Sequence, residues 1–205
     1  TVVTEDITLT AKWKAVVQFD ANYPNAGTMP QKEVMENGKL SEADLAAPSR
    51  TGTGYQFDGW YKNRNFAQAD KVTKDTAITE NITLYAKWLC TVTFDTKQPN
   101  LSQPSVSVTE GAAIGSHLPE LTKEGLTFAG WYKDEAFTEA LKFGETSVVN
   151  ENMTLYAKWT AKVTFHFNYE GAPASVESAP IVVGGSMPSQ EDPTREGYQF
   201  DGWYT

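Results

Sequence analysis

The chain has 205 residues, of which 40% are hydrophobic and 21% charged, a balance that is typical of a globular protein and excludes a disordered one. The formal net charge is −9, and Lys and Arg are not clustered, so nucleic acid and anionic membranes are poor candidate partners. No stretch approaches the roughly 18–20 apolar residues that cross a bilayer, and no signal peptide opens the sequence. We therefore expect no membrane span in this fragment.

The composition favours β-strands. Aromatic residues make up 12% of the chain, with six Trp, nine Tyr and ten Phe. Aromatic and β-branched side chains fit a pleated, half-buried surface. Cys90 is the one cysteine, so no intrachain disulfide can form, and hydrophobic burial alone must stabilise the fold.

Two signatures recur in fixed order along the chain. The first is found as YQFDGWYK at 55–62, LTFAGWYK at 126–133 and YQFDGWYT at 198–205. The second is found as TEDITLTAKW at 4–13, TENITLYAKW at 79–88 and NENMTLYAKW at 150–159. Trp60 and Trp88 are 28 residues apart, as are Trp131 and Trp159. A fixed period of this kind indicates tandem copies of one folded unit.

The period divides the chain into four segments. Residues 1–13 are the terminal strand of a preceding repeat, residues 14–88 are repeat one, residues 89–159 are repeat two, and residues 160–205 are the first part of a third repeat. This division predicts a parent protein that is longer at both ends. The alternative is a head-to-tail contact, in which residues 1–13 complete the unfinished third repeat of a neighbouring molecule.

Each repeat is expected to open with two strands. The first alternates apolar and polar residues, which predicts one buried face. Cys90 falls on that face, where the other copies have Ala, and is interpreted as a small buried hydrophobe. The second strand is expected near Lys32–Glu36, with equivalents at Val106–Thr109 and Ile181–Val183.

A short helix is expected next. It would cover Ser41–Ala47, because Ser41 can act as the N-cap and Pro48 closes the run. The matching helix of repeat two would cover Ile114–Leu121, although Pro119 interrupts it.

The strand that carries the GWY sequence has a glycine inside it. Gly59 occupies this position in repeat one, and a glycine within a strand often marks a bulge. A bulge would let Phe57 and Trp60 face the same core despite their odd spacing. It would leave Tyr61 facing outward.

The terminal strand alternates again, and its apolar face completes the expected core. Each aromatic residue supplies a large buried area. The expected core residues are Phe19, Phe57, Trp60, Leu84, Trp88, Phe94, Phe128, Trp131, Leu155, Trp159, Phe165, Phe200 and Trp203. Candidate surface-binding residues, on the opposite faces, are Tyr61, Tyr85 and Tyr132.

The two signatures, on a repeat of roughly seventy residues, resemble the Listeria–Bacteroides repeat, also called the internalin-type B repeat. The resemblance covers essentially the whole chain. It implies an α+β fold of tandem β-grasp (ubiquitin-like) repeats, each a mixed four-stranded sheet with one short helix. It also implies a bacterial cell-surface or secreted, extracellular protein, and it brings no catalytic residues. Ala129 stands where the other copies have Asp58 and Asp201, so we expect no role that needs this carboxylate in every repeat.

The sequence offers few groups for chemistry, and no catalytic, cofactor-binding or metal-binding residue is predicted. His117 and His166 do not recur between copies and are interpreted as surface residues. An acidic residue followed by Asp or Asn recurs before each terminal strand, and a turn or strand-entry role is expected, with a calcium site as the alternative. The residues concerned are Glu5, Asp6, Glu80, Asn81, Glu151 and Asn152. Lysines beside the terminal tryptophans, namely Lys12, Lys87 and Lys158, raise the further alternative of an isopeptide crosslink.

These observations favour a protein that is not an enzyme. The repeats are joined by only two or three residues, which restricts hinge motion and favours an elongated spacer, or stalk, in an adhesin-like protein. The alternative is a protein- or glycan-binding adhesion module that acts through exposed aromatics or a sheet edge. Its partner would be a host or bacterial surface protein or a glycan.

Overall fold

The computed structural model describes residues 2–50, 52 and 54–205. Thr1, in the expected terminal strand, and Thr51 and Thr53, in repeat one, lie outside the described residues. The chain forms two compact units. The first comprises Thr1–Thr91, Ser107–Ala112 and Val148–Asn152; the second comprises Val92–Val106, Ala113–Ser147 and Met153–Thr205.

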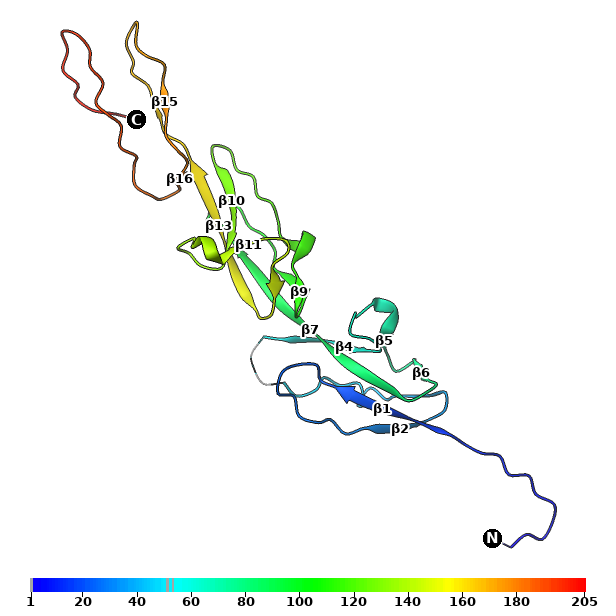
Figure 1. Cartoon of the computed structure of the whole chain (residues 1–205). Coiled ribbons are helices and arrows are strands. Elements are labelled where there is room, and N and C mark those ends of the chain that lie inside the picture. The colour runs from blue at the N-terminus through cyan, green and yellow to red at the C-terminus, as the bar shows by residue number, and fades with distance from the viewer. Residues whose placement is uncertain (1, 51, 53) are drawn as a thin grey trace. The chain divides into compact units, whose positions relative to one another are not determined.

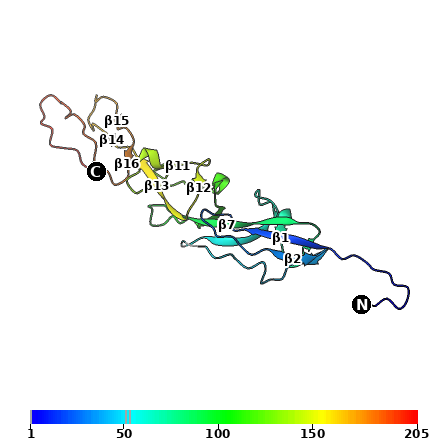
Figure 2. The ribbon, with the colours of Figure 1, turned by 60° about the horizontal axis from the view of Figure 1, so that its bottom comes forward.

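Repeat one is built on a mixed sheet with the strand order β2-β1-β7-β4-β5 (Figure 1). Its strands are β1 (Lys14–Asp20), β2 (Lys32–Met35), β4 (Gln56–Tyr61), β5 (Lys71–Val72) and β7 (Ile82–Asp95). β1 runs parallel to β7, and the other neighbours are antiparallel. Figure 2 shows β1 and β2 beside β7 from another side. A small ribbon of β3 (Gly38–Lys39) and β6 (Ala77–Ile78) accompanies the sheet.

Repeat two uses the same pairings. Its strands are β8 (Val106–Thr109), β9 (Ala112–Ala113), β10 (Thr127–Tyr132), β11 (Lys142–Phe143), β12 (Val148–Val149) and β13 (Met153–Ala161). β13 pairs parallel with the second half of β7 and antiparallel with β10, which pairs with β11. β8 pairs with β7, and β9 with β12. β7 therefore serves as the last strand of repeat one and the first strand of repeat two.

The third repeat contains only short strands. β14 (Thr164–Phe165) pairs with β15 (Val176–Glu177), and β16 (Ile181–Val182) pairs with the end of β13. Its GWY segment, residues 199–205, forms no strand. Residues 2–13 also form no strand (Figure 1), although the Trp13 carbonyl accepts a hydrogen bond from the Glu36 N–H at 2.9 Å. The terminal strand expected there is not formed, because among the described residues no strand lies beside it.

The core of repeat one is aromatic. Trp60 is 1% exposed, and Phe19 and Phe57 pack edge-on against it with ring centroids 4.9 and 5.6 Å away. The period-2 pattern of β7 accounts for this arrangement, since Leu84, Ala86 and Trp88 all point into the same cluster.

The bulge predicted at Gly59 is present. The pairing of β4 with β7 shifts between Phe57 and Gly59, and the shift recurs in repeat two between Phe128 and Gly130. Gly59 has a φ of 146°, a conformation that residues with a Cβ rarely adopt. The extra residue places Phe57 and Trp60 on the same core, as expected.

The expected helix and the β-grasp architecture are wrong. Among the described residues there is no α-helix, only the three-residue 3₁₀ turns η1 (Gln68–Asp70), η2 (Gly115–His117) and η3 (Glu139–Leu141). The segment expected to be helical in repeat one makes a single turn, with bonds from the Leu45 N–H to the Ser41 carbonyl at 3.2 Å and from the Ala46 N–H to the Ala43 carbonyl at 3.4 Å. Ser41 and Asp44 form a reciprocal capping box, in which Asp44 Oδ2 accepts from the Ser41 N–H and the Ser41 hydroxyl oxygen accepts from the Asp44 N–H. The start signal is therefore present, but no helix continues beyond it.

The lengths of these segments give the physical reason. A helix needs a costly nucleus, and a run of about seven residues cannot offset that cost. In repeat two, Gly115 has a φ of 55° and opens a 3₁₀ turn, and Pro119 follows. Ile114 and Leu121 are nevertheless buried, so the segment covers the core without being a helix.

Candidate functional site

Most of the expected core residues are buried. The buried members are Trp60, Leu84, Trp88, Phe94, Trp131, Leu155, Trp159 and Phe165. The members that are partly exposed are Phe19, Phe57, Phe128, Phe200 and Trp203. The recurring aromatic positions therefore serve packing, which leaves the other positions as candidates for a site.

Two of the three candidate surface aromatics are buried, which corrects the expectation. Tyr61 is 0% and Tyr132 is 2% exposed. Both point away from the tryptophan core, but the loop after the GWY strand folds over them. Phe66 packs edge-on against Tyr61 at 5.5 Å, and Phe137 does the same to Tyr132 at 5.7 Å. A period-2 pattern predicts which way a side chain points, but not whether a loop covers it.

A carboxylate and two lysines surround Tyr61. The Tyr61 hydroxyl donates a hydrogen bond to Asp58 Oδ2 at 2.5 Å. Lys71 and Lys87 place their Nζ atoms 3.2 and 3.3 Å from the carboxylate oxygens of Asp58. Burial tends to raise the pKa of Asp58, but the bonds from Tyr61 and the lysines outweigh it, so this pKa lies below its usual value. Burial, together with Asp58, raises the pKa of Tyr61.

Repeat two rebuilds this cluster from a different element. Ala129 replaces the carboxylate, and the Tyr132 hydroxyl instead donates to Glu139 Oε2 at 3.1 Å. Glu139 opens η3, and the aligned first residue of η1 is Gln68. The acid has therefore moved from the strand to the 3₁₀ turn, while the buried tyrosine keeps its acceptor and Lys158 Nζ still lies 5.0 Å from the ring centroid.

This exchange predicts a rescue. Asp58→Ala leaves the Tyr61 hydroxyl without its acceptor and should lower the free energy of unfolding by about 1–3 kcal/mol. Adding Gln68→Glu, which reproduces the arrangement of repeat two, should recover most of that loss. Gln68→Glu alone is the matched control, and chemical denaturation followed by fluorescence measures all three variants. A double variant no more stable than Asp58→Ala would show that the two acids do not play the same role.

A cation covers the third candidate aromatic, Tyr85, which is half-buried. The Arg64 guanidinium lies 4.7 Å from the ring centroid of Tyr85 and pairs with Asp20 at 2.6 Å. Tyr85 is therefore not a bare aromatic surface.

Repeat two covers its equivalent tyrosine with a cation from the opposite segment. Lys97 Nζ lies 4.8 Å from the ring centroid of Tyr156 and 3.1 Å from Glu135. Lys97 aligns with Asn22, and Glu135 aligns with Arg64. Arg64 of repeat one is replaced by the anion Glu135, and the cation of repeat two comes instead from Lys97. The pairing is thus maintained although neither residue type is.

Arg50 joins the two repeats within the first unit. Its guanidinium makes two bonds of 2.7 Å to the carboxylate of Glu110, in the turn that follows β8. It also lies 3.5, 4.8 and 5.0 Å from the ring centroids of Tyr55, Trp88 and Tyr23. The Arg50 side chain is only 7% exposed. The sequence did not point to Arg50, because neither of the other two repeats has an arginine at the same distance from its GWY signature.

The recurring asparagines lie at the entry of the last strand, but they bond the first strand of the repeat and not the local backbone that was expected. Asn81 Oδ1 accepts a hydrogen bond from the Val16 N–H, and Asn152 Oδ1 accepts one from the Thr91 N–H, each at 2.7 Å. Each asparagine thus ties the entry of the last strand to the first strand of its own repeat.

Few other polar groups gather. His117 and His166 are exposed. Cys90 is fully buried, and burial raises the pKa of its thiol. Within the described ranges, no three His, Cys, Asp or Glu side chains lie close enough together to hold a metal ion. Nor does that part of the chain contain a helix long and apolar enough to cross a membrane.

Three known proteins resemble the chain over much of its length. It is 38% identical over 203 residues to a protein of Evansella cellulosilytica named "Putative membrane protein", with 97% of this chain and 29% of the relative covered. It is 38% identical over 212 residues to a second protein of that organism, named "Putative Gly-rich membrane protein", with 97% and 24% covered. It is 32% identical over 113 residues to Internalin H of Listeria monocytogenes, with 54% and 20% covered.

The chain therefore spans less than a third of the length of each of these relatives. The model of the Listeria–Bacteroides repeat domain matches it three times, at residues 16–87, 91–158 and 162–205. These matches cover most of the chain and both recurring signatures. The chain belongs to the Listeria–Bacteroides repeat family.

Proposed function

We propose that this chain is a non-enzymatic spacer, or stalk, within a bacterial surface or secreted adhesin-like protein, and that it works outside the cell. The names of the relatives support the location: two are named as membrane proteins and one as an internalin. The coverage supports a role as part of a longer protein, since the relatives extend well beyond the matched region.

The paired exchanges between the repeats carry the proposal. Asp58 with Gln68 in repeat one corresponds to Ala129 with Glu139 in repeat two, and each pair supplies one acceptor to a buried tyrosine. A reactive or ligand-binding group would have to keep its chemical type and its place. Here the carboxylate moves from the strand to the 3₁₀ turn, while its internal contact with the tyrosine is kept.

The connection between repeats also suits a spacer. β7 is a single strand of 14 residues that contains the end of repeat one and the start of repeat two. β13 likewise continues past Trp159 to Ala161, where the third repeat begins. Repeat one therefore leads into repeat two through a continuous strand, and not through a loop that could act as a free hinge.

Small-angle X-ray scattering tests the spacer. A spacer function requires an extended particle, whereas a compact globule of this length would have a radius of gyration of about 17 Å. We expect a value clearly above this and a distance distribution with a long tail. A measured radius near the globular value would contradict the proposal.

The competing function is a binding module for a protein or a glycan. The aromatic residues proposed for such binding are poorly accessible, because Tyr61 and Tyr132 are buried and Arg64 covers Tyr85. A glycan array and a partner pull-down with the isolated chain separate the two functions. Saturable binding would favour the module, and its absence in both assays would favour the spacer.

A further inference from the structure

Repeats one and two each begin and end on strands that are parallel neighbours in the sheet (Figure 1). In repeat one, residues 17–20 of β1 pair with residues 82–85 of β7. In repeat two, residues 92–95 of β7 pair with residues 153–156 of β13. The chain therefore enters each of these repeats on one strand of a parallel pair and leaves it on the other.

This geometry decides how a pull along the chain is distributed. A pull on the preceding segment draws the first strand toward its own N-terminus, and a pull on the following segment draws the last strand toward its own C-terminus. Because the two strands are parallel, these pulls slide one strand along the other. All the hydrogen bonds between them are then strained at once, whereas an antiparallel hairpin pulled by its two ends opens one bond after another.

A side-chain hydrogen bond extends each ladder at its start. Asn81 Oδ1 accepts from the Val16 N–H, one residue before the first backbone pair of β1 with β7. Asn152 Oδ1 accepts from the Thr91 N–H at the matching place in repeat two. Because these bonds join the first strand to the residue that leads into the last strand, a pull on the chain strains them together with the backbone bonds.

Further bonds extend the ladder of repeat one at its other end. The Trp88 Nε1–H donates to the Ala21 carbonyl at 2.8 Å, and Asn22 Nδ2 donates to the Ala86 carbonyl at 3.0 Å. Repeat two keeps the tryptophan bond, in which the Trp159 Nε1–H donates at 2.7 Å to the carbonyl of the residue that follows β7. Polar side chains therefore tie the two strands together at both ends of each ladder.

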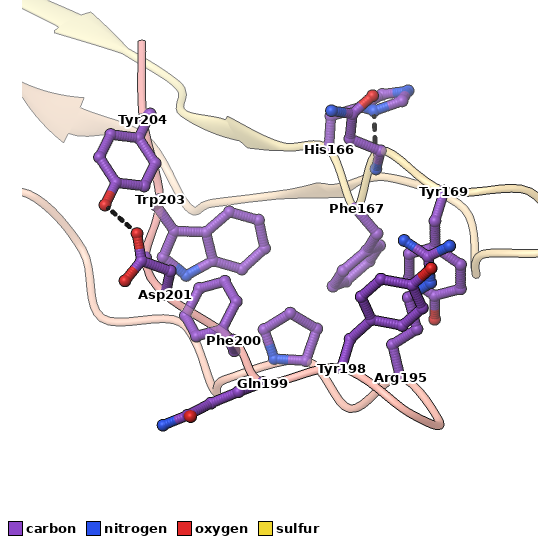
Figure 3. A pocket seen from close by; sticks show the side chains of 13 residues that line it. His166, Phe167, Tyr169, Arg195, Tyr198, Gln199, Phe200, Asp201, Trp203 and Tyr204 are labelled. Carbon is purple, nitrogen blue, oxygen red and sulfur yellow. Dashed lines mark hydrogen bonds between the residues drawn. The ribbon is translucent and has the colours of Figure 1, made fainter.

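A recurring turn aims the carbonyl that each tryptophan uses. In all three repeats, the residue at the end of the first strand accepts a hydrogen bond from the N–H two positions further on. The acceptors are Asp20, Asp95 and His166, the last through its Nδ1 atom (Figure 3). The donor residues, each with a φ of 53–54°, are Asn22, Lys97 and Asn168. This left-handed turn fixes the direction in which the chain leaves the first strand.

We propose that the parallel first and last strands form a mechanical clamp in repeats one and two, so that these repeats stay folded under tension. The proposal rests on the spacer function, because a spacer held at both ends is the part of a protein that comes under load. β7, as one continuous strand, passes the tension from the clamp of repeat one directly to that of repeat two. The strands β4 and β5 lie between the clamped strands in the sequence and outside this load path.

Single-molecule force spectroscopy tests the clamp. The 205-residue chain is held by its two ends under constant force, and the rate of each unfolding step is recorded. Repeats one and two should each unfold in one step, because the bonds of a clamp fail together. Each step should lengthen the chain by about 200–250 Å, the extended length of a repeat less the span of its folded strands.

Two variants address the two clamps separately. Asn81→Ala removes one bond between β1 and the entry of β7, so it should accelerate the step of repeat one about 2- to 10-fold at a given force. The step of repeat two, in the same molecule, should keep its rate. Asn152→Ala should do the reverse. Asn81→Asp keeps the accepting oxygen and should unfold at the rate of the wild type.

Val72→Ala is the control for overall stability. Val72 is buried in β5, which is separated from β1 by two strands, so its replacement should lower the equilibrium stability but leave the rate under force nearly unchanged. Chemical denaturation provides the equilibrium comparison. Equal acceleration by Val72→Ala and Asn81→Ala would overturn the clamp, as would an unchanged rate in Asn81→Ala or unfolding of either repeat in several small steps. Any of these results together with an extended particle in solution scattering would remove the clamp and leave the spacer standing, whereas a compact particle would remove the spacer itself.

Discussion

Replacing Trp88 with alanine should lower the free energy of unfolding of the first unit by about 3–5 kcal/mol. Trp88 is only 5% exposed, and its ring contacts Phe57 and the Arg50 guanidinium. The substitution removes these contacts and leaves a cavity that the surrounding sheet cannot fill. It also removes the donor that satisfies the Ala21 carbonyl. Chemical denaturation, followed by circular dichroism, measures the change.

Trp13→Ala is the matched control for this experiment. Trp13 closes the same signature but is 68% exposed. Its replacement should change the free energy of unfolding by no more than about 0.5 kcal/mol. If Trp88→Ala and Trp13→Ala had equal effects, the position of Trp88 in the core would be wrong.

Replacing Arg50 with alanine should cost about 3 kcal/mol, the lower end of the range for breaking a buried ion pair. The lower end applies because Glu110 keeps 21% of its side-chain surface exposed, whereas Arg50 keeps 7%. Glu110 would lose both of its bonds of 2.7 Å, and the rings of Tyr55 and Trp88 would lose the cation above them. Thermal and chemical unfolding measure the loss.

Arg50→Lys and a double-mutant cycle show where this energy resides. Lysine keeps the charge but cannot make the two parallel bonds or stack as a plane, so Arg50→Lys should fall between wild type and Arg50→Ala. The cycle with Glu110→Ala should give a coupling energy of about 0.5–3 kcal/mol. Strict additivity would mean that the aromatic rings, and not Glu110, account for the effect of Arg50.

The strands and the aromatic core could be predicted from local sequence. An alternating pattern is set by the pleat of the strand, so the buried faces of β1 and β7 are visible in the residues themselves. The bulge was also predictable, because Gly59 marks a backbone conformation that other residues avoid. The first strand of each repeat followed from the same reasoning.

The helix could not be excluded from local sequence. Ser41 and Pro48 are sound start and stop signals, but such signals do not tell whether a short segment gains enough from packing to form a helix. In the structure, Leu45 reaches the core from a single turn. The balance between turn and helix is set by the distance that the segment must span over the sheet, and that distance is a property of the tertiary structure.

The sequence by itself determined that one aromatic-cored unit recurs, which faces of its strands are apolar, and where its backbone bulges, because each of these depends on residues that are neighbours along the chain. Only the tertiary structure decided that Tyr61 is covered and that Arg50 pairs with Glu110. Arg50 and Glu110 are 60 residues apart in the sequence. Tyr61 and Phe66 are only 5 residues apart, but they meet because the loop between them folds back over the sheet. No local pattern encodes them, since they arise only when loops fold back over the sheet.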